Sequence, residues 1–127
     1  MGAKNDTGAR TTTTRSEHDL LGYLDVPTDA YFGVHTARAV DNFPITGIQL
    51  AIYPAFIGAL AAVKQAAATA NRDIGALDNA KADAIISVAR EIRQGALHEQ
   101  FVVDMIQGGA GTSTNMNTNE VIANRAL

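Results

Sequence analysis

Apolar side chains recur with a helical period in an alanine-rich segment that runs from Pro54 to Asn71. Their steps of three and four residues place them on one face of an α-helix, and a proline suits the first turn of such a helix. We therefore predict a helix over residues 54–71. Its predicted buried face consists of Phe56, Leu60, Val63, Ala67 and Ala70.

A second helix is predicted over residues 78–94. Asp78 is a suitable N-cap. Gly95 is a natural residue just beyond the other end, because glycine readily adopts the left-handed conformation found there. The apolar period assigns the buried face of this helix to Ala82, Ile85, Ala89 and Ile92.

A third helix is predicted after the glycine-rich segment Gln107–Gly111. Residues 112–115 (Thr-Ser-Thr-Asn) offer several N-cap candidates in a row, and Asn117 with Glu120 three residues later resembles a capping box. The apolar pattern is still running at Leu127. We therefore expect the chain to be truncated inside this helix, with the helix's apolar face exposed for lack of packing partners.

The segment before these helices has little periodicity. Residues 1–15 carry no apolar period and are expected to be a disordered tail. This tail lacks the apolar core of a signal peptide, so a cytoplasmic location is expected. The elements predicted after it are short strands over Leu20–Leu24 and Ala30–Val34, separated by a turn at Val26–Asp29, and a helical turn over Thr36–Asn42 that ends before Pro44.

Composition narrows the fold class. The chain has 127 residues, of which 46% are hydrophobic and 18% charged. This composition is too apolar for a disordered chain and too polar for a membrane protein. No apolar run reaches the ~18 residues that a transmembrane helix needs. Aromatic residues make up 6% and tryptophan is missing. The core must therefore be aliphatic and alanine-rich, and we predict a mainly α domain, with close-packed helices preceded by an irregular segment with short strands.

Charge and cysteine content exclude several functions. The net charge of −3 provides no basic excess for phosphate contacts, so nucleic-acid binding is not expected. The lack of cysteine excludes disulfides, thiolate nucleophiles and cysteine metal sites. The glycine-rich segment is not a phosphate-binding P-loop, because Thr112 follows Gly111 where that motif needs lysine. It is not a dinucleotide fingerprint either, because Thr114 stands where the third glycine belongs.

The glycine-rich segment and the helix start after it have the chemistry of an anion site. Free N–H groups and the positive end of a helix dipole favour a carboxylate, and glycines let the backbone approach a ligand closely. Thr112, Ser113 and Asn115 add neutral donors. The same residue types are ordinary helix caps in proteins without any ligand, so spacing alone leaves both interpretations open.

Other candidate residues carry weaker signals. Arg38 has the chemistry to pair a substrate carboxylate bidentately, or it forms a structural ion pair. For His35, a structural hydrogen-bonded role is favoured because no catalytic triad pattern surrounds it. His18 and His98 are expected to face solvent, and residues 17–19 (Glu-His-Asp) are too local to form a metal site.

Residues 109–117 (Gly-Ala-Gly-Thr-Ser-Thr-Asn-Met-Asn), followed by Asn119-Glu120-Val121, resemble the first signature region of the fumarase/aspartase superfamily. Class II fumarases typically show Trp-Gly-Ala-Gln-Thr at residues 32–36 and Thr-Gly-Ser-Gly-Thr-Gln-Ser at residues 108–114, and this sequence differs in both places. The other segments resemble the N-terminal part of bacterial aspartate ammonia-lyases: residues 19–22, 26–27, 30–36, 38–40, 42–45 and 100–107.

This resemblance implies an N-terminal lyase domain over residues 16–127. It also implies the reversible elimination of ammonia from L-aspartate to give fumarate, in a homotetramer that needs no organic cofactor. Thr112 matches the threonine that hydrogen-bonds the substrate, and Ala110, Gly111 and Ser113 would frame the same pocket edge through their backbone. Arg38 is a weaker candidate for substrate binding.

The superfamily builds each active site from three regions on different subunits, and this sequence contains only the first of them. The Thr-His pair of the second region and the Gly-Ser-Ser loop with the base serine of the third do not occur in it. We therefore expect no catalytic residue in this chain and no activity from it alone. The alternatives are an N-terminal fragment of a class II fumarase and a non-catalytic remnant or interaction domain.

Overall fold

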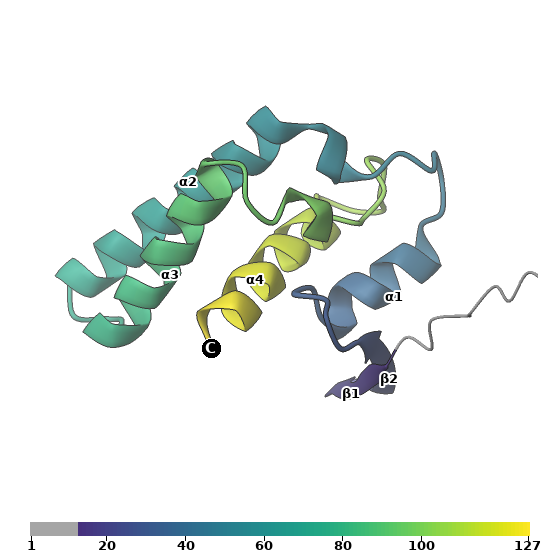
Figure 1. The fold of residues 1–127 in the computed structure, drawn as a ribbon, viewed down its shortest axis with the longest axis horizontal. Coiled ribbons are helices and arrows are strands. Elements are labelled where there is room, and N and C mark those ends of the chain that lie inside the picture. The colour runs from purple at the N-terminus through teal and green to yellow at the C-terminus, as the bar shows by residue number, and fades with distance from the viewer. Residues whose placement is uncertain (1–12) are drawn as a thin grey trace, which may run out of the picture.

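Helices α2 and α3 form a hairpin at one end of the molecule, and α4 lies between this hairpin and α1 (Figure 1). The computed structural model describes residues 13–127. The helices are α1 (Val34–Asn42), α2 (Pro54–Asp73), α3 (Asn79–Arg93) and α4 (Thr112–Ala126), with short 3-10 turns at η1 (Leu50–Ile52) and η2 (His98–Gln100). The strands are β1 (Thr14–Asp19) and β2 (Gly22–Pro27), which pair antiparallel. The predicted mainly α fold class is confirmed.

The strands lie at other positions than those predicted. β1 begins at Thr14, so Arg15 belongs to the hairpin and not to the expected tail, of which residues 1–12 lie outside the described residues. Leu20 and Leu21 form the turn between the strands. The predicted strand over Leu20–Leu24 overlaps β2 only at residues 22–24. β1 was not predicted, because its inward positions alternate as Arg, Glu and Asp, which an apolar pattern does not detect.

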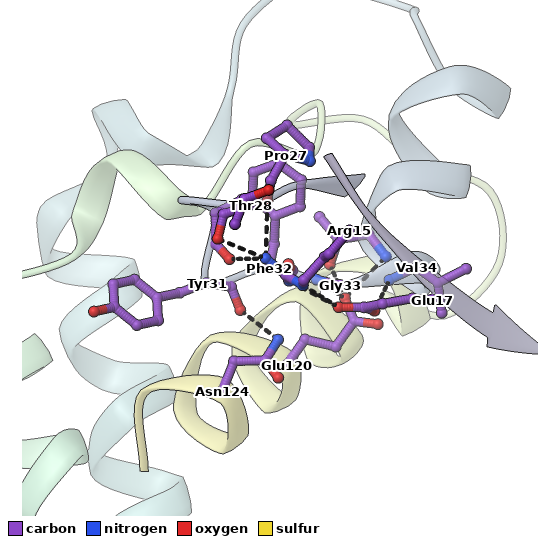
Figure 2. Close-up of polar contacts among 12 residues, drawn as sticks. Arg15, Glu17, Pro27, Thr28, Tyr31, Phe32, Gly33, Val34, Glu120 and Asn124 are labelled. Atoms are coloured by element: carbon purple, nitrogen blue, oxygen red, sulfur yellow. Dashed lines mark hydrogen bonds and ion pairs between the residues drawn. The ribbon is translucent and has the colours of Figure 1, made fainter. Parts of the chain in front are cut away.

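No strand forms over Ala30–Val34, where a second one was predicted; Arg15 holds residues 30–33 in an irregular conformation, and α1 begins at Val34. The Arg15 guanidinium donates hydrogen bonds to the carbonyl oxygens of Pro27 at 2.8 Å, Ala30 at 2.7 Å and Phe32 at 2.8 Å (Figure 2). These bonds satisfy carbonyl groups that a strand would have paired in a sheet. The helical turn predicted from Thr36 is confirmed as α1, which begins two residues earlier.

Helix α2 has the predicted start but a different buried face. The structure buries Ile57, Ala61 and Ala68, and leaves Phe56 and Val63 47% and 65% exposed. The predicted face was wrong because α2 carries apolar side chains all round, so that the period alone does not say which side meets α3.

Helix α3 agrees with its prediction at both ends. The Asp78 side chain accepts a hydrogen bond from Lys81 N at 3.1 Å, and Gly95 has the left-handed φ of 99° expected after the helix. Ala82, Ala89 and Ile92 are fully buried, and Ile85 is half-buried.

The core gathers where α2, α3 and α4 meet the segment after η2. Phe101 and Val103 from that segment pack with Ile57, Ile92 and Val121, all at most 1% exposed. Full burial of a side chain of this size contributes about 1.5–3 kcal/mol. The apolar face of α4 is therefore buried. The expectation that it would be exposed was wrong because α1 and α3 both pack against it.

The pair Asn117 and Glu120 does not form the predicted capping box. Asn117 is fully buried in the middle of α4, where its side-chain amide donates to Gln100 O at 2.9 Å. Glu120 instead reaches the first turn of α1. Its carboxylate accepts hydrogen bonds from the N–H groups of Gly33 at 2.9 Å, His35 at 2.8 Å and Thr36 at 3.0 Å. A residue 84 to 87 positions away thus caps α1.

Gly33 stands between two carboxylates in this junction (Figure 2). Glu17 of β1 accepts a hydrogen bond from Val34 N at 2.8 Å. A Cβ atom on Gly33 would lie 2.7 Å from Glu17 Oε2 and 3.0 Å from Glu120 Oε1. A side chain at this position would therefore displace one of the carboxylates that cap α1.

We expect Glu120→Gln to lower the free energy of unfolding by about 2 kcal/mol, because an amide replaces a carboxylate that accepts several charge-assisted hydrogen bonds. The measurement is urea unfolding followed by circular dichroism. Glu99→Gln is the matched control, since Glu99 is exposed and, within residues 13–127, its side chain accepts only a 3.5 Å hydrogen bond from Gln100. Equal unfolding midpoints for the two variants would contradict the capping role.

Asp104 ties the segment before the glycine-rich loop to the chain before η1. Its buried carboxylate accepts hydrogen bonds from the N–H groups of Thr46 at 2.7 Å, Gly47 at 2.8 Å and Ile106 at 2.8 Å, and from the Thr46 hydroxyl at 2.8 Å. Burial raises the pKa of this carboxyl, but the hydrogen bonds outweigh burial and lower the pKa to about 2.

This lowered pKa predicts acid sensitivity. The hydrogen-bonded carboxylate contributes stability that is fully present above the unfolded pKa of about 3.9 and is lost as the pH falls toward about 2. We expect Asp104→Asn to be less stable than the wild type at pH 7 and to lose less stability between about pH 4 and pH 2. Urea midpoints across this range measure the difference, and parallel curves for both proteins would contradict it.

Candidate functional site

The candidate site is the start of α4, where the predicted residues 110–113 lie together on the surface. Gly111 occupies the N-cap position with a left-handed φ of 79°, and Gly109 has a φ of 75°. Ala110, Gly111 and Thr112 are exposed, and Ser113 is half-buried. Because glycine has no side chain, the N-cap residue itself leaves the first N–H groups of α4 uncovered. Thr112 therefore lies at the open mouth of the helix.

Gln107 closes the glycine-rich loop onto α4, a role that the sequence analysis missed. Its side-chain oxygen accepts a hydrogen bond from Thr114 N at 2.7 Å, and its side-chain nitrogen donates to the Thr114 hydroxyl at 2.6 Å. These bonds satisfy the third N–H group of the helix. Within residues 13–127, no acceptor bonds the N–H groups of Thr112 and Ser113. The sequence could have shown this role only through the spacing of Gln107, seven residues before Thr114. No standard capping motif has this spacing, so the pair was not recognised.

The charges around this helix start favour an anion. The first turn of α4 contains no acidic side chain, so no charge of the helix itself opposes the positive end of the dipole. Lys64 of α2 reaches the same turn and donates a hydrogen bond to Asn115 Oδ1 at 2.6 Å. The site thus combines two free N–H groups, the hydroxyls of Thr112 and Ser113 and a nearby ammonium group, which together suit a carboxylate.

The structure brings Arg38 to the β-hairpin instead. Its guanidinium donates to both carboxylate oxygens of Asp19, at 2.9 and 3.0 Å, and to Gly22 O at 2.9 Å. The hydrogen bond from Arg38 is the largest cause that lowers the pKa of Asp19; burial opposes it and the bond from Leu21 N adds to it. This geometry is the structural ion pair that the sequence left open as an alternative. Arg38 therefore does not join residues 110–113.

Within residues 13–127, none of the hydrogen bonds, ion pairs or ring contacts of the three histidines involves residues 110–113. His35 is exposed, with Nδ1 3.8 Å from Asp19 Oδ2, and His18 is exposed and packs its ring on Tyr23. The prediction that His98 faces solvent was wrong, because its ring is half-buried and Nε2 bonds Ile92 O at 2.8 Å. Across residues 13–127, no three His, Asp or Glu side chains are placed to hold a metal ion.

A groove of about 270 Å³ between α2, α3 and α4 begins beside Lys64. Its walls are mainly apolar, with Ile85 and Ile122 among the lining side chains. None of residues 110–113 lines it. An apolar groove does not suit a small dicarboxylate, so the polar helix start and not this groove is the candidate site. None of the helices described over residues 13–127 is long and apolar enough to cross a membrane.

Known proteins share this arrangement of elements. A family model described as lyase matches residues 22–127. Among curated proteins, the chain is 60% identical over 115 residues to an aspartate ammonia-lyase of Pseudomonas aeruginosa and 54% identical over 113 residues to one of Bacillus subtilis. It is 55% identical over 112 residues to a class II fumarate hydratase of Halobacterium salinarum. These matches cover 88–91% of the chain but 23–24% of the relatives.

Solved structures agree with these matches. The fold is similar to a fumarate lyase:delta crystallin from Brucella melitensis in native form, with a TM-score of 0.88 and 56% identity over 90% of this chain and 26% of that one. A class II fumarase from Schistosoma mansoni gives a TM-score of 0.84 at 34% identity, over 90% of this chain and 24% of that one. The chain therefore spans about a quarter of the length of its relatives.

The family model covers residues 22–127, and the similar proteins and structures match about nine-tenths of the chain in sequence and in fold. The chain belongs to the fumarase/aspartase superfamily of lyases.

Proposed function

We propose that this chain supplies the carboxylate-binding wall of an aspartate ammonia-lyase active site, formed by Thr112 with Ala110, Gly111 and Ser113. The observation that carries the proposal is the open start of α4, where the N–H groups of Thr112 and Ser113 have no acceptor within the described residues. The ammonium group of Lys64 adds positive charge beside the same turn. A small dicarboxylate such as L-aspartate or fumarate is the ligand that this chemistry favours.

The reaction explains why such donors are needed. Elimination of ammonia from L-aspartate begins when a base takes a proton from Cβ, and the adjacent carboxylate then gains charge as an aci-carboxylate. Donors that already point at this developing charge stabilise the transition state. The backbone N–H groups of residues 112 and 113 are held by the helix itself, and Gln107 fixes the loop before them. They therefore need little reorganisation when the charge appears.

Aspartase is preferred to fumarase because of the names of the similar proteins and because of two sequence motifs. Two of the three curated proteins named above are aspartate ammonia-lyases, and residues 32–36 and 108–114 depart from the typical fumarase patterns. The class II fumarate hydratase of Halobacterium salinarum, at 55% identity, keeps a fumarase as the second candidate. Both enzymes handle fumarate, so the carboxylate-binding role of Thr112 is the same in either case.

The complete enzyme is proposed to be a cytoplasmic homotetramer that uses no organic cofactor, as the family resemblance implies. The chain spans 24% of its Pseudomonas relative. The base serine and the second region would come from sequence that this chain does not contain. Residues 110–113 would then bind substrate without providing the group that removes the proton.

The chain alone is expected to form no fumarate from L-aspartate, because it holds one of the three active-site regions. The measurement is the ultraviolet absorbance of fumarate in a solution of the purified chain and L-aspartate, with the Pseudomonas relative as the positive control. Turnover above that of a heat-denatured sample would contradict the requirement for the other two regions.

The role of Thr112 is testable in a hybrid enzyme, in which residues 13–127 replace the matching segment of the Pseudomonas relative. We expect Thr112→Val to lower kcat by about 100-fold, since loss of one donor to a developing oxyanion typically costs 10²–10³. Thr112→Ser, which keeps the hydroxyl, should retain most activity. Thr69→Val is the matched control, because the Thr69 hydroxyl bonds Gln65 O inside α2.

Two results would change the proposal. Unchanged kinetics in Thr112→Val would remove the role assigned to the Thr112 hydroxyl. A second hybrid, made with the Halobacterium fumarate hydratase, tests the other candidate function: hydration of fumarate by that hybrid, with no ammonia release by the first, would favour the fumarase.

A further inference from the structure

The chain between α1 and α2 runs beside the segment that leads into the glycine-rich loop. Gln49 and Asp104 form an antiparallel bridge, with backbone hydrogen bonds of 2.8 and 3.0 Å on either side of it. Continued beyond the bridge, this antiparallel register brings residues 43–47 beside residues 106–110. The end of α1 and the glycine-rich loop are therefore neighbours in the fold.

The ring of Phe43 lies against the first glycine of this loop. A Cβ atom on Gly108 would lie 3.0 Å from Phe43 Cε1 and 3.2 Å from Phe43 Cζ. Gly108 does not have a positive φ, so this position needs the small size of glycine and not its backbone freedom. Phe43 is half-buried and packs against the core. The ring is therefore held from behind and limits how far the loop can approach it.

Helix α1 connects this ring to α4. Phe43 is the C-cap residue of α1, and its N–H donates a hydrogen bond to Ala39 O at 3.0 Å. At the other end of α1, Glu120 of α4 accepts the N–H groups of Gly33 and Thr36. With nine residues, α1 spans about 13 Å. One end of α1 is thus bound to α4, and the other end carries the ring that contacts the loop before α4.

The glycine-rich loop therefore has a fixed group on each side. Gln107 holds it to α4 by two hydrogen bonds of 2.6 and 2.7 Å, and Phe43 contacts it from the side of α1. Between these two supports, a Cβ atom on Gly109 or Gly111 would meet no atom of the described residues within 4 Å. The middle of the loop thus has little packing of its own, and its position depends on the two supports.

We propose that Phe43 is a positioning residue of the carboxylate-binding site. Its ring fixes the glycine-rich loop and, through the loop, the directions of the N–H groups of Thr112 and Ser113. Phe43 acts through Gly108 and does not itself bind the ligand. A shift of a binding group by about 1 Å can cost about 100-fold in rate, so an apolar side chain outside the site is enough to change kcat. This inference rests on the proposed function, because it assigns a role toward the same site.

The first test uses the purified chain and makes no assumption about activity. The reporter is the amide proton of Thr114, because its N–H is bonded to Gln107 at 2.7 Å. In Phe43→Ala the loop loses one support, and NMR should show this proton exchanging with deuterium faster by about tenfold or more. Ile86→Ala is the matched control for a general loss of packing, because Ile86 is buried on α3 and outside the core cluster that Phe43 joins. An unchanged rate in Phe43→Ala, or an equal rise in both variants, overturns the proposal.

The second test measures catalysis in the hybrid enzyme that contains residues 13–127. We expect Phe43→Ala to lower kcat for L-aspartate by about tenfold or more. Phe43→Leu, which keeps an apolar side chain beside Gly108, should stay within about threefold of the parent hybrid. Circular dichroism and the mass of the assembly check that each variant folds like the parent, and Thr69→Val is the control. A folded Phe43→Ala hybrid with the kcat of the parent overturns the proposal.

A double-mutant cycle between residues 43 and 108 separates positioning from a general effect on the fold. In the parent hybrid, the methyl group of Gly108→Ala presses on the Phe43 ring, since it would lie 3.0 Å from Cε1, and should lower kcat by about threefold or more. In the Phe43→Leu hybrid the outer ring atoms are gone, so Gly108→Ala should cause little further loss. Losses that simply multiply in the double variant would overturn the role assigned to the ring.

The variant Thr112→Val in the same hybrid distinguishes this proposal from the proposed function. If Thr112→Val lowers kcat and Phe43→Ala does not, the carboxylate site stands and the positioning role of Phe43 is overturned. If neither variant lowers kcat, both proposals are overturned, and faster exchange at Thr114 in the first test then reports a structural contact only.

Discussion

The carboxylate of Glu120 joins parts of the molecule that are far apart in the sequence. It accepts the N–H groups of Gly33 and Thr36 in the first turn of α1, which would otherwise be left unsatisfied in a partly buried place. Glu17 brings a second carboxylate to the same turn from β1. The carboxylates of Glu17 and Glu120 carry like charges and are held close together by N–H donors that lie between them. Gly33 has no side chain, which leaves room for both carboxylates. The position of α4 relative to α1 and the hairpin depends on this junction.

Helix α4 therefore serves two purposes. Its first turn carries the candidate carboxylate site, and two turns later Glu120 and Val121 anchor the same helix to α1 and the core. The loop before the helix is held from both ends, by Asp104 through the chain at residues 46–47 and by Gln107 through Thr114. Stability and site geometry are thus coupled: a change that releases α4 from α1 also moves the N–H groups proposed to bind substrate.

The comparison between sequence and structure differs from element to element. The starts of α2 and α3 and the cap at Asp78 were predictable, because helical period and capping act over a few residues. The hairpin was not, because its inward positions carry Arg15 and Glu17, whose role is to hold distant backbone groups. The buried face of α2 was also misjudged, since an all-apolar helix satisfies the same period on either side.

The sequence by itself determined the helices, the open glycine-rich start of α4 and the superfamily, because each depends on local spacing or on an ordered match of many residues. Only the tertiary structure decided which groups remain free to act. Arg38 is bound to Asp19 and Glu120 is bound to α1, while the N–H groups of Thr112 and Ser113 have no acceptor within the described residues. The physical reason is that a hydrogen-bond partner 19 residues away, as for Arg38, or 84 or more residues away, as for Glu120, leaves no trace in local sequence spacing.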